Sequence, residues 1–435
     1  MHETLAQPAA RGRRRLGPNT VERTDLGRPE PPPGTRVDVV VACHTPARPI
    51  GRAVASLLDG NPEAAVTVVC HNRTAEEIAS AIRPEHRELV RYLEHIDPRP
   101  SASGPFNAGM RAARTPWVSI MGSDDRLAAG AVASWLTLSG ATGAEFIIPR
   151  LALGSPTTIV PTPAPRPTRL LAPYLCSRAA GRGPNRPGGP AARAIRRLAC
   201  TDLVADRLAY RSAPLGLLSV AMLRRTGAHL VEGVPVGEDV AMATGLFATV
   251  PTAYDAAGPV YLIGEDASDR VTYVVRPMDE QLGFLPALVT APWFNSLTAA
   301  QRRAVVVKMV RIHVFGAVYY RDREEIWTPT ERAALAGMCR RLHGAAPGFD
   351  RVLSLADRDL LDACLDPAVP AATLIHRAQA RRRHGRPATL LTRDPAWLLD
   401  REAPLRFMSA SLLTKLLPAV SVPVAAGAPP APDQD

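Results

Sequence analysis

Two pairs of adjacent carboxylates are the residues in this sequence best suited to chemistry. Asp124 and Asp125 follow an apolar run at 117–121, and Glu238 and Asp239 form the second pair. Adjacent charges at the end of a buried strand are costly unless a cation or solvent meets them. Magnesium and manganese take one or two protein carboxylates and complete their coordination shell with water and substrate phosphates. The first pair therefore suits a divalent metal ion, although Asp125 could instead cap the following helix.

The second pair has two interpretations. A carboxylate acts as a general base when it lies within hydrogen-bond reach of the proton that it removes. Alternatively, Glu238 and Asp239 open a helix at its positive N-terminal end, which is a common and stabilising arrangement. The residues alone leave both interpretations open.

The elements that must position these acids alternate between strands and helices. Residues 49–58 carry apolar side chains at helical spacing, and Thr74 and Glu77 form a capping-box signature. Strands are expected at 37–43, 66–70, 117–121, 145–149 and 215–223. This alternation predicts an α/β fold with a mostly parallel sheet covered on both faces. Ligands of such sheets bind at the carboxyl ends of the strands, where the loop after Cys70 and the Asp124–Asp125 pair are found.

The composition divides the chain into five parts. Residues 1–36 are rich in Arg, Pro and Gly and are expected to be a disordered tail, and 37–275 hold the α/β domain. Within that domain, 156–200 form a Pro/Arg/Gly-rich insertion that is typical of a lid, a binding loop or disorder. A helical C-terminal region is expected at 276–410, and a second tail at 411–435.

Charge and cysteine usage limit the location and the partners. The 52 basic and 41 acidic residues give a formal net charge of +11, and Lys308 and Lys415 are the only lysines. The six cysteines are far apart, which favours reduced thiols in a cytoplasmic protein. We expect no signal peptide and no membrane-spanning helix. Clustered arginines leave open a peripheral contact with the inner face of a membrane, but they lack the interleaved aromatic residues of a nucleic-acid binder.

Three segments together resemble a known family. GPFNAGMRAARTPWVSIMGSDD, from Gly104 to Asp125, is similar to the part of family 2 glycosyltransferases where an Asn-x-Gly helix precedes a hydrophobic strand and an Asp-containing metal motif. VDVVVACHTPARPIGRAVASLL and Gly237-Glu238-Asp239 match the family in order and spacing across 37–275. The resemblance implies a GT-A type fold, flanked here by an α-helical C-terminal appendage, and an inverting transferase that uses a nucleotide-sugar donor with Mn²⁺ or Mg²⁺.

The resemblance also implies roles for individual residues. Asp124 would contact the donor's ribose, and Asp125 would ligate the metal that bridges the diphosphate and acts as a Lewis acid. Asp239 would be the general base, with Glu238 as its rival. Asn107 would orient the loop beneath the donor.

The chain departs from the family pattern at three places. Gly122 stands where the family usually has a further Asp. The second strand ends in Cys70-His71-Asn72 instead of an acidic residue that holds the base, so Asn72, or a neutral His71, is expected to read the base edge. Thr45, with His44 as a weaker candidate, replaces the Asn of the family's first turn as a nucleotide contact.

Two functions from different classes remain after the sequence analysis. The first is a hexosyltransferase-like enzyme that moves a sugar from a nucleotide donor to a hydroxyl of a saccharide, a lipid-linked or another acceptor, as in cell-surface polysaccharide or glycoconjugate synthesis. The second is an inactive GT-A-like protein that binds a nucleotide sugar or a partner. Retention of both acid pairs favours the enzyme, whereas Asn72 favours the inactive protein. The sequence does not predict an oligomeric state.

Overall fold

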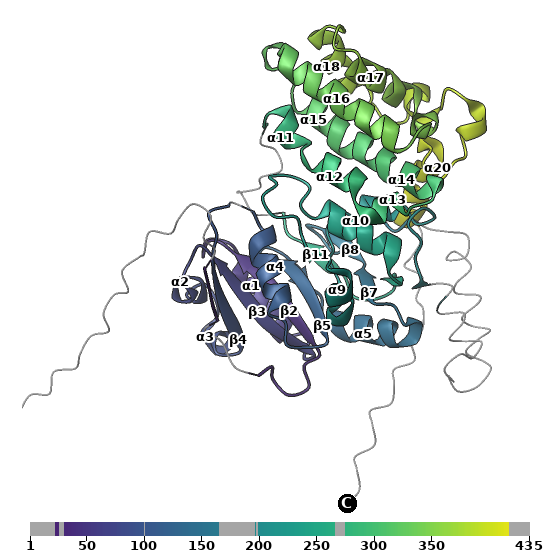
Figure 1. Ribbon diagram of the computed structural model, residues 1–435. Coiled ribbons are helices and arrows are strands. Elements are labelled where there is room, and N and C mark those ends of the chain that lie inside the picture. Colours follow the sequence, from purple (N-terminus) through teal and green to yellow (C-terminus); the bar gives the residue numbers. More distant parts are fainter. Residues whose placement is uncertain are drawn as a thin grey trace, which may run out of the picture.

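The computed structural model describes residues 22–25, 30–99, 101–164, 196, 199–265 and 275–416. An α/β body carries the N-terminal half of the chain, and a stack of helices formed by the C-terminal part lies against one end of it (Figure 1). None of the described helices is both long and apolar enough to cross a membrane.

The body is built on an eight-stranded sheet in the order β1-β4-β3-β2-β5-β9-β7-β10. Its strands are β1 (Glu22–Asp25), β2 (Val37–Cys43), β3 (Ala64–His71), β4 (Val90–Ile96), β5 (Trp117–Gly122), β7 (Phe146–Pro149), β9 (Leu217–Ser219) and β10 (Thr252–Asp255). Strands β4, β3, β2 and β5 run parallel, as do β7 and β10. The edge strand β1 is antiparallel to β4, and β9 is antiparallel to both of its neighbours. The prediction of a mostly parallel sheet is confirmed.

Helices cover both faces of this sheet because its strands alternate between two cores. In β2, Val39 and Val41 enter the core under α1 (Ile50–Leu58) and α5 (Ala131–Thr142), whereas Val40 enters the core under α4 (Ser103–Arg111), α9 (Val220–Thr226) and α10 (Val240–Thr249). The short helices α2 (Ala75–Ala79) and α3 (Pro84–Arg87) lie between β3 and β4 in sequence. The run VDVVVAC is apolar because successive side chains point to opposite, equally buried faces.

A small sheet joins the body beside the end of β5. It consists of β6 (Arg126–Leu127), β11 (Tyr261–Ile263) and β8 (Leu151–Leu153), in the order β6-β11-β8. Strand β11 is antiparallel to β6 and parallel to β8. It therefore runs next to the two residues that follow the first acid pair.

The strands and helices predicted from short sequence patterns agree with the structure except at one element. Strand β2 has the predicted bounds, and Thr74 caps α2 in a complete capping box with Glu77. The expected strand at 215–223 was wrong in its second half, because β9 ends at Ser219 and α9 begins there. The Ser219 hydroxyl accepts a hydrogen bond from the Met222 N–H, which is a helix cap that an apolar run conceals.

Two expected irregular segments are described only in part. Within the predicted tail at 1–36, residues 22–25 form β1. Most of the 156–200 insertion lies outside the described residues, but its first part follows the small sheet, with Ile159 bridged to Ala152. The predicted tail at 411–435 begins inside the last helix, and its residues 417–435 lie outside the described part.

The C-terminal region is helical, as predicted. Its α-helices are α11 (Met278–Gln281), α12 (Phe284–Thr290), α13 (Pro292–Asn295), α14 (Ala299–Lys308), α15 (Phe315–Tyr319), α16 (Pro329–Ala345), α17 (Leu355–Leu365), α18 (Ala371–Ala380), α19 (Pro387–Leu390) and α20 (Pro404–Leu416). The short 3-10 helices are η1 (Leu208–Tyr210), η4 (Glu324–Ile326), η5 (Phe349–Val352) and η6 (Pro395–Trp397). A π-helical segment, η3 (Met309–Val314), joins α14 to α15 without a break. One hydrophobic core continues from the sheet into these helices.

The packing of α4 on β2 gives a test of the fold. A Cβ atom at Gly109 would overlap the side chain of Val40, so we expect Gly109→Ala to lower the free energy of unfolding by about 1–3 kcal/mol. Gly140 in α5 is the matched control, since its Cβ would meet nothing within 4 Å. Gly140→Ala should raise stability by about 0.5–1 kcal/mol through helix propensity. Urea unfolding measures both, and equal effects would contradict close packing at Gly109.

Candidate functional site

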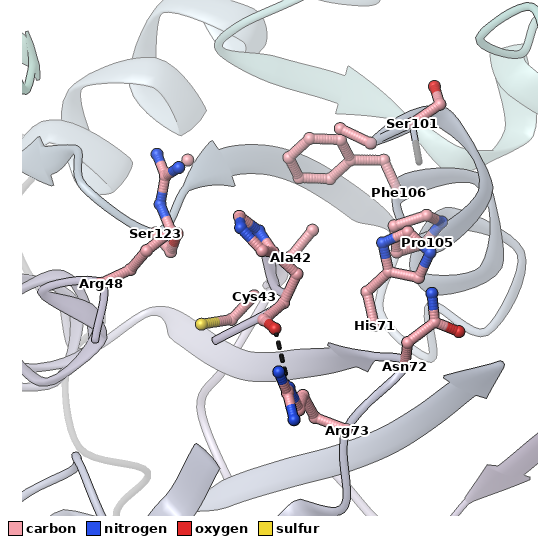
Figure 2. Close-up of a pocket in the computed structure, with 13 residues that line it drawn as sticks. Ala42, Cys43, Arg48, His71, Asn72, Arg73, Ser101, Pro105, Phe106 and Ser123 are labelled. Carbon is pink, nitrogen blue, oxygen red and sulfur yellow. Dashed lines mark hydrogen bonds between the residues drawn. The ribbon is translucent and has the colours of Figure 1, made fainter. Parts of the chain in front are cut away.

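A pocket of about 500 Å³ opens where the carboxyl ends of β2, β3 and β5 meet the beginning of α4 (Figure 2). Its described lining includes the side chains of His44, Arg48, His71, Arg73 and Phe106 and contains no acidic residue. The site lies where open α/β sheets bind ligands. Arg48 and Arg73 are ion-paired with acids outside the lining, Asp124 at 2.9 Å and Glu77 at 3.7 Å, so the pocket surface itself is basic and favours an anionic ligand.

The end of β3 gives the pocket one neutral imidazole. Burial lowers the pKa of His71, so the ring is uncharged at neutral pH. Its Nε2 is buried and has no hydrogen-bond partner among the described residues. A buried ring nitrogen without a partner is costly unless a ligand or water meets it. Figure 2 shows this ring beside Pro105, at the same end of the pocket as Asn72.

Asn72 lines the pocket, but its amide is also used within the protein. It adopts a left-handed backbone conformation (φ 56°), and its side chain bonds both backbone groups of Asp97: Nδ2 donates to the carbonyl at 2.8 Å, and Oδ1 accepts from the N–H at 2.9 Å. Asn tolerates this conformation better than most residues. The side chain therefore closes the turn after β3 and positions the pocket rim.

Thr45 also forms hydrogen bonds within a turn. Its Oγ1 accepts from the Ala47 N–H at 3.3 Å, and its carbonyl accepts from the Cys43 thiol at 3.2 Å. The neighbouring His44 lines the pocket, whereas Thr45 is not among the lining residues that the structure describes. Between the two candidates at this turn, the geometry places His44 nearer to a ligand.

Asn107 ties α4 to the loop that leads to the second acid pair. Its Nδ2 donates to the Leu230 carbonyl at 2.8 Å and to Glu232 at 2.9 Å, and its Oδ1 accepts from the Leu230 N–H at 2.9 Å. The side chain is only 1% exposed. Arg99 contacts Glu232 from the other side at 3.0 Å. Asn107 thus holds the loop that precedes Glu238; its predicted role beneath the donor stays a prediction.

Asp124 lies beside the pocket and faces its basic wall. Oδ1 is 2.9 Å from the Arg48 guanidinium, which lines the pocket, and the Asp124 carbonyl accepts from Arg52 at 2.8 Å. Arg48 comes from the turn after β2, and Arg52 comes from α1. One segment, residues 48–52, which is distant from Asp124 in sequence, therefore holds this aspartate at the carboxyl end of β5.

The Asp125 carboxylate is hydrogen-bonded to residues on and next to the small sheet. Its Oδ2 accepts from the Tyr261 hydroxyl at 2.6 Å and from the Gly122 N–H at 3.2 Å, and its Oδ1 accepts from the Gly264 N–H at 2.9 Å. Burial raises the pKa of Asp125, and these donors oppose that shift. All three partners are donors, so the ionised carboxylate is the form that satisfies them.

The second acid pair opens α10, and a buried lysine lies near it. Burial and then the charge of Asp239 raise the pKa of Glu238 to about 7. Burial also raises the pKa of Asp239, whereas the charge of Lys308 opposes that shift. Lys308 is 1% exposed, its own pKa is lowered to about 8 by burial, and Nζ donates to Ser212 at 2.9 Å and to His313 Nε2 at 2.8 Å.

The site includes three residues that the sequence analysis missed. Arg48, Tyr261 and Lys308 reach the two acid pairs from other segments. Lys308 had a detectable signal, because it is one of two lysines among 52 basic residues. An ammonium is more compact than a guanidinium, which suits a buried position beside a carboxylate. Arg48 and Tyr261 gave no such signal in the sequence, because Asp124 and Asp125, their partners, are 76 and 136 positions away.

Comparison with known proteins identifies the fold. No protein-family model matches the chain, and no curated protein sequence matches it. Among solved structures, residues 1–349 of S. aureus TarS in complex with UDP-GlcNAc match with a TM-score of 0.60 and 13% identity, covering 81% of this chain and 93% of that one. The same protein in complex with UDP matches at 0.55 and 14%, with the same coverage. The chain therefore has the GT-A type glycosyltransferase fold, and at this identity the likeness shows the fold alone.

The carboxylates of the first acid pair are oxygen ligands of the kind that a divalent metal ion takes. Within the described residues, no group of three or more His, Cys, Asp and Glu side chains is placed to hold a metal. A site made of one carboxylate, water and a ligand's phosphates needs no such group. Asp124 lies at the pocket edge with its Oδ1 against Arg48, and Asp125 accepts from three protein donors, which leave one of its four acceptor positions open.

The two aspartates should differ in their effect on stability. Asp125→Asn replaces one acceptor oxygen with an NH₂ group, so a buried N–H or O–H loses its acceptor, and we expect a loss of about 1–3 kcal/mol in the free energy of unfolding. Asp124→Asn should cost clearly less, since its Oδ1 lies against Arg48 at the edge of a polar pocket. Urea unfolding of both variants measures the difference. A larger loss for Asp124→Asn would contradict the structural role of Asp125.

Proposed function

We propose that this chain is an inverting glycosyltransferase that transfers a hexosyl group from a nucleoside-diphosphate sugar to an acceptor hydroxyl. The observation that carries the proposal is the acid-free pocket at the carboxyl ends of β2, β3 and β5, flanked by the Asp124–Asp125 pair in a GT-A type fold. The acceptor would be a saccharide, a lipid-linked or another hydroxyl compound. We place the reaction in the cytoplasm, with peripheral membrane contact as an option for a lipid-linked acceptor.

The pocket supports donor binding at both ends. The unpartnered Nε2 of His71 is positioned to hydrogen-bond a nucleobase, and Asn72 shapes the rim beside it. Arg48 and Arg73 supply positive charge for a diphosphate. Leaving the His71 Nε2 buried without a partner costs free energy. A nucleobase whose edge forms a hydrogen bond with this nitrogen would remove that cost.

We propose that Mn²⁺ or Mg²⁺ binds at Asp124 and that Asp125 positions the loop. When bound, the ion would neutralise the charge that develops on the departing nucleoside diphosphate. Arg48 would then turn from Asp124 toward the phosphates, because the metal ion would replace Arg48 as the partner of the carboxylate. The diphosphate would attract the guanidinium. This assignment exchanges the two roles that the family resemblance implies for Asp124 and Asp125.

Asp239 is our candidate for the general base. It would take the proton of the acceptor hydroxyl as the oxygen attacks the anomeric carbon, while the bond to the diphosphate breaks on the opposite side. Lys308 would keep Asp239 ionised near neutral pH, since a nearby positive charge lowers the pKa of a carboxyl group. Glu238 remains the rival because its pKa of about 7 is also suited to proton transfer.

Substitution of the acid pair tests catalysis separately from binding. We expect Asp239→Asn to lower turnover by roughly 10²–10⁴-fold and to leave donor affinity unchanged. Glu238→Gln should retain much more activity. The measurements are hydrolysis of UDP- and GDP-sugars with Mn²⁺ and calorimetric titration of UDP and GDP. The opposite ranking would move the base to Glu238, and nucleotide binding without hydrolysis in the unmodified protein would support the inactive, nucleotide-sugar-binding alternative.

The proposed role of Lys308 predicts a shift in the pH profile. Lys308→Met removes the positive charge that lowers the pKa of Asp239, so that pKa should rise and the acid limb of kcat/KM should move to higher pH. Ser212→Ala is the control, because it removes a hydrogen-bond partner of Lys308 but keeps the charge. Its acid limb should stay within a few tenths of a pH unit of the unmodified protein. An unmoved limb in Lys308→Met would exclude Lys308 from tuning the base.

A further inference from the structure

The helical region contains a second cavity that the proposed function has not used. It has a volume of about 460 Å³ and lies between Val236, the π-helical segment η3, α15 and the turn after α18. We call it the arginine–tyrosine cavity and define it by Arg381, Arg382, Tyr319, Tyr320 and Ile312. None of its described lining residues is acidic.

The cavity carries excess positive charge. Asp357 lies behind its wall and is shared by two guanidiniums, with Oδ2 2.9 Å from Arg311 and Oδ1 2.8 Å from Arg381. Glu402 adds a second negative charge near Arg311, but it is also paired with Arg207 at 3.1 Å, so three guanidiniums share two carboxylates. Arg382 adds a further charge, and its exposed guanidinium lies 4.0 Å from the centre of the Tyr319 ring. An arginine stacked in this way keeps its N–H groups available to an anion.

The cavity also exposes apolar surface. Ten large hydrophobic residues are exposed among the described part of the chain, and three of them line this cavity: Val275 at 43%, Ile312 at 49% and Tyr320 at 42%. Large apolar groups gathered beside polar ones mark binding sites. Ile312 lies in the π-helical segment η3, and π-helical turns recur at functional sites.

The cavity wall is continuous with the second acid pair. Val236 lines the cavity and precedes Gly237-Glu238-Asp239 directly. His313 lines it as well, and its ring meets Phe284 edge-to-face at 4.8 Å and accepts from Lys308, the lysine near Asp239. A Cβ at Gly237 would lie 2.6 Å from the Phe284 ring, so the acid loop sits tightly on this wall. The cavity therefore shares Val236 and the packed rings of His313 and Phe284 with the loop that carries the candidate base, although neither Glu238 nor Asp239 is among its described lining residues.

We propose that the arginine–tyrosine cavity is the acceptor site and that the acceptor is an anionic saccharide. Its phosphate or carboxylate groups are held by Arg381 and Arg382, and a sugar ring lies on Tyr320 and Ile312. The acceptor role rests on the proposed glycosyltransferase function, whereas anion binding by the cavity does not.

Binding to matched hexasaccharides tests the proposal on the full chain. The probes are fluorescent maltohexaose, the same sugar bearing phosphate esters, and hexagalacturonate, and the readout is fluorescence anisotropy. We expect the anionic probes to bind and the neutral one to bind at least tenfold more weakly; the ratio between phosphate and carboxylate probes identifies the charged group. Arg382→Glu and Tyr320→Ala should each weaken anionic binding by roughly tenfold or more. Arg341→Ala, an exposed arginine of α16 outside the cavity, is the control and should change nothing.

The outcomes separate the cavity from the donor site. Equal affinity for neutral and anionic probes, or anionic binding that survives Arg382→Glu, would overturn the proposal. Tighter binding of a single-stranded DNA oligomer than of either saccharide anion would replace it with a nucleic-acid site. UDP titration is measured on the same variants and should be unaffected, because the donor pocket and the cavity share no described lining residue. Absence of UDP binding in the unmodified protein, with anionic binding retained there, would refute the proposed function and leave the cavity as an anionic-saccharide site.

Discussion

The hydrogen bonds of the Asp125 carboxylate are the constraint on which the site depends. They connect the end of β5 to Tyr261 and Gly264 on and after β11, and so join the large sheet to the small one. Without that joint, the loop after β5 would leave two adjacent negative charges in poorly solvated surroundings. With it, Asp125 is satisfied internally, and Asp124 is left to face Arg48 and the pocket. One acid of the pair holds the loop, and the other borders the pocket.

The second acid pair of the α/β body also depends on the C-terminal helices. The core continues from the sheet through α10 into the C-terminal helices, and Lys308 brings a buried positive charge from α14 to the acid pair at the start of α10. A buried ammonium requires its partners, and Ser212 and His313 supply them. The helical region is therefore part of the site's electrostatics and is not a separate appendage. The electrostatic environment of Asp239 would be different in the isolated body.

The parts that the sequence predicts well are those set by local rules. Strand β2 and the capping box at Thr74 follow from patterns of a few residues, and the alternation of such patterns yields the mostly parallel sheet. The boundary at Ser219 failed because a strand and a buried helix are equally apolar over so short a run. The division of labour between Asp124 and Asp125 was out of reach, because it is decided by Tyr261 and Gly264, more than a hundred positions later. Long-range contacts of this kind leave no local trace.

The π-helical segment between α14 and α15 has a consequence for how this protein can diverge. The three segments form one continuous rod, and the wide turn accommodates an extra residue relative to an α-helix. Because the turn absorbs that residue, its loss would restore a regular α-helical turn and leave α14 and α15 in nearly their present orientation. Lys308, upstream of the turn, and Tyr319 and Tyr320, downstream of it, would keep their places, whereas Ile312, inside it, would not. A single-codon deletion would thus remodel one part of the cavity wall without moving the tyrosines or the acid pair.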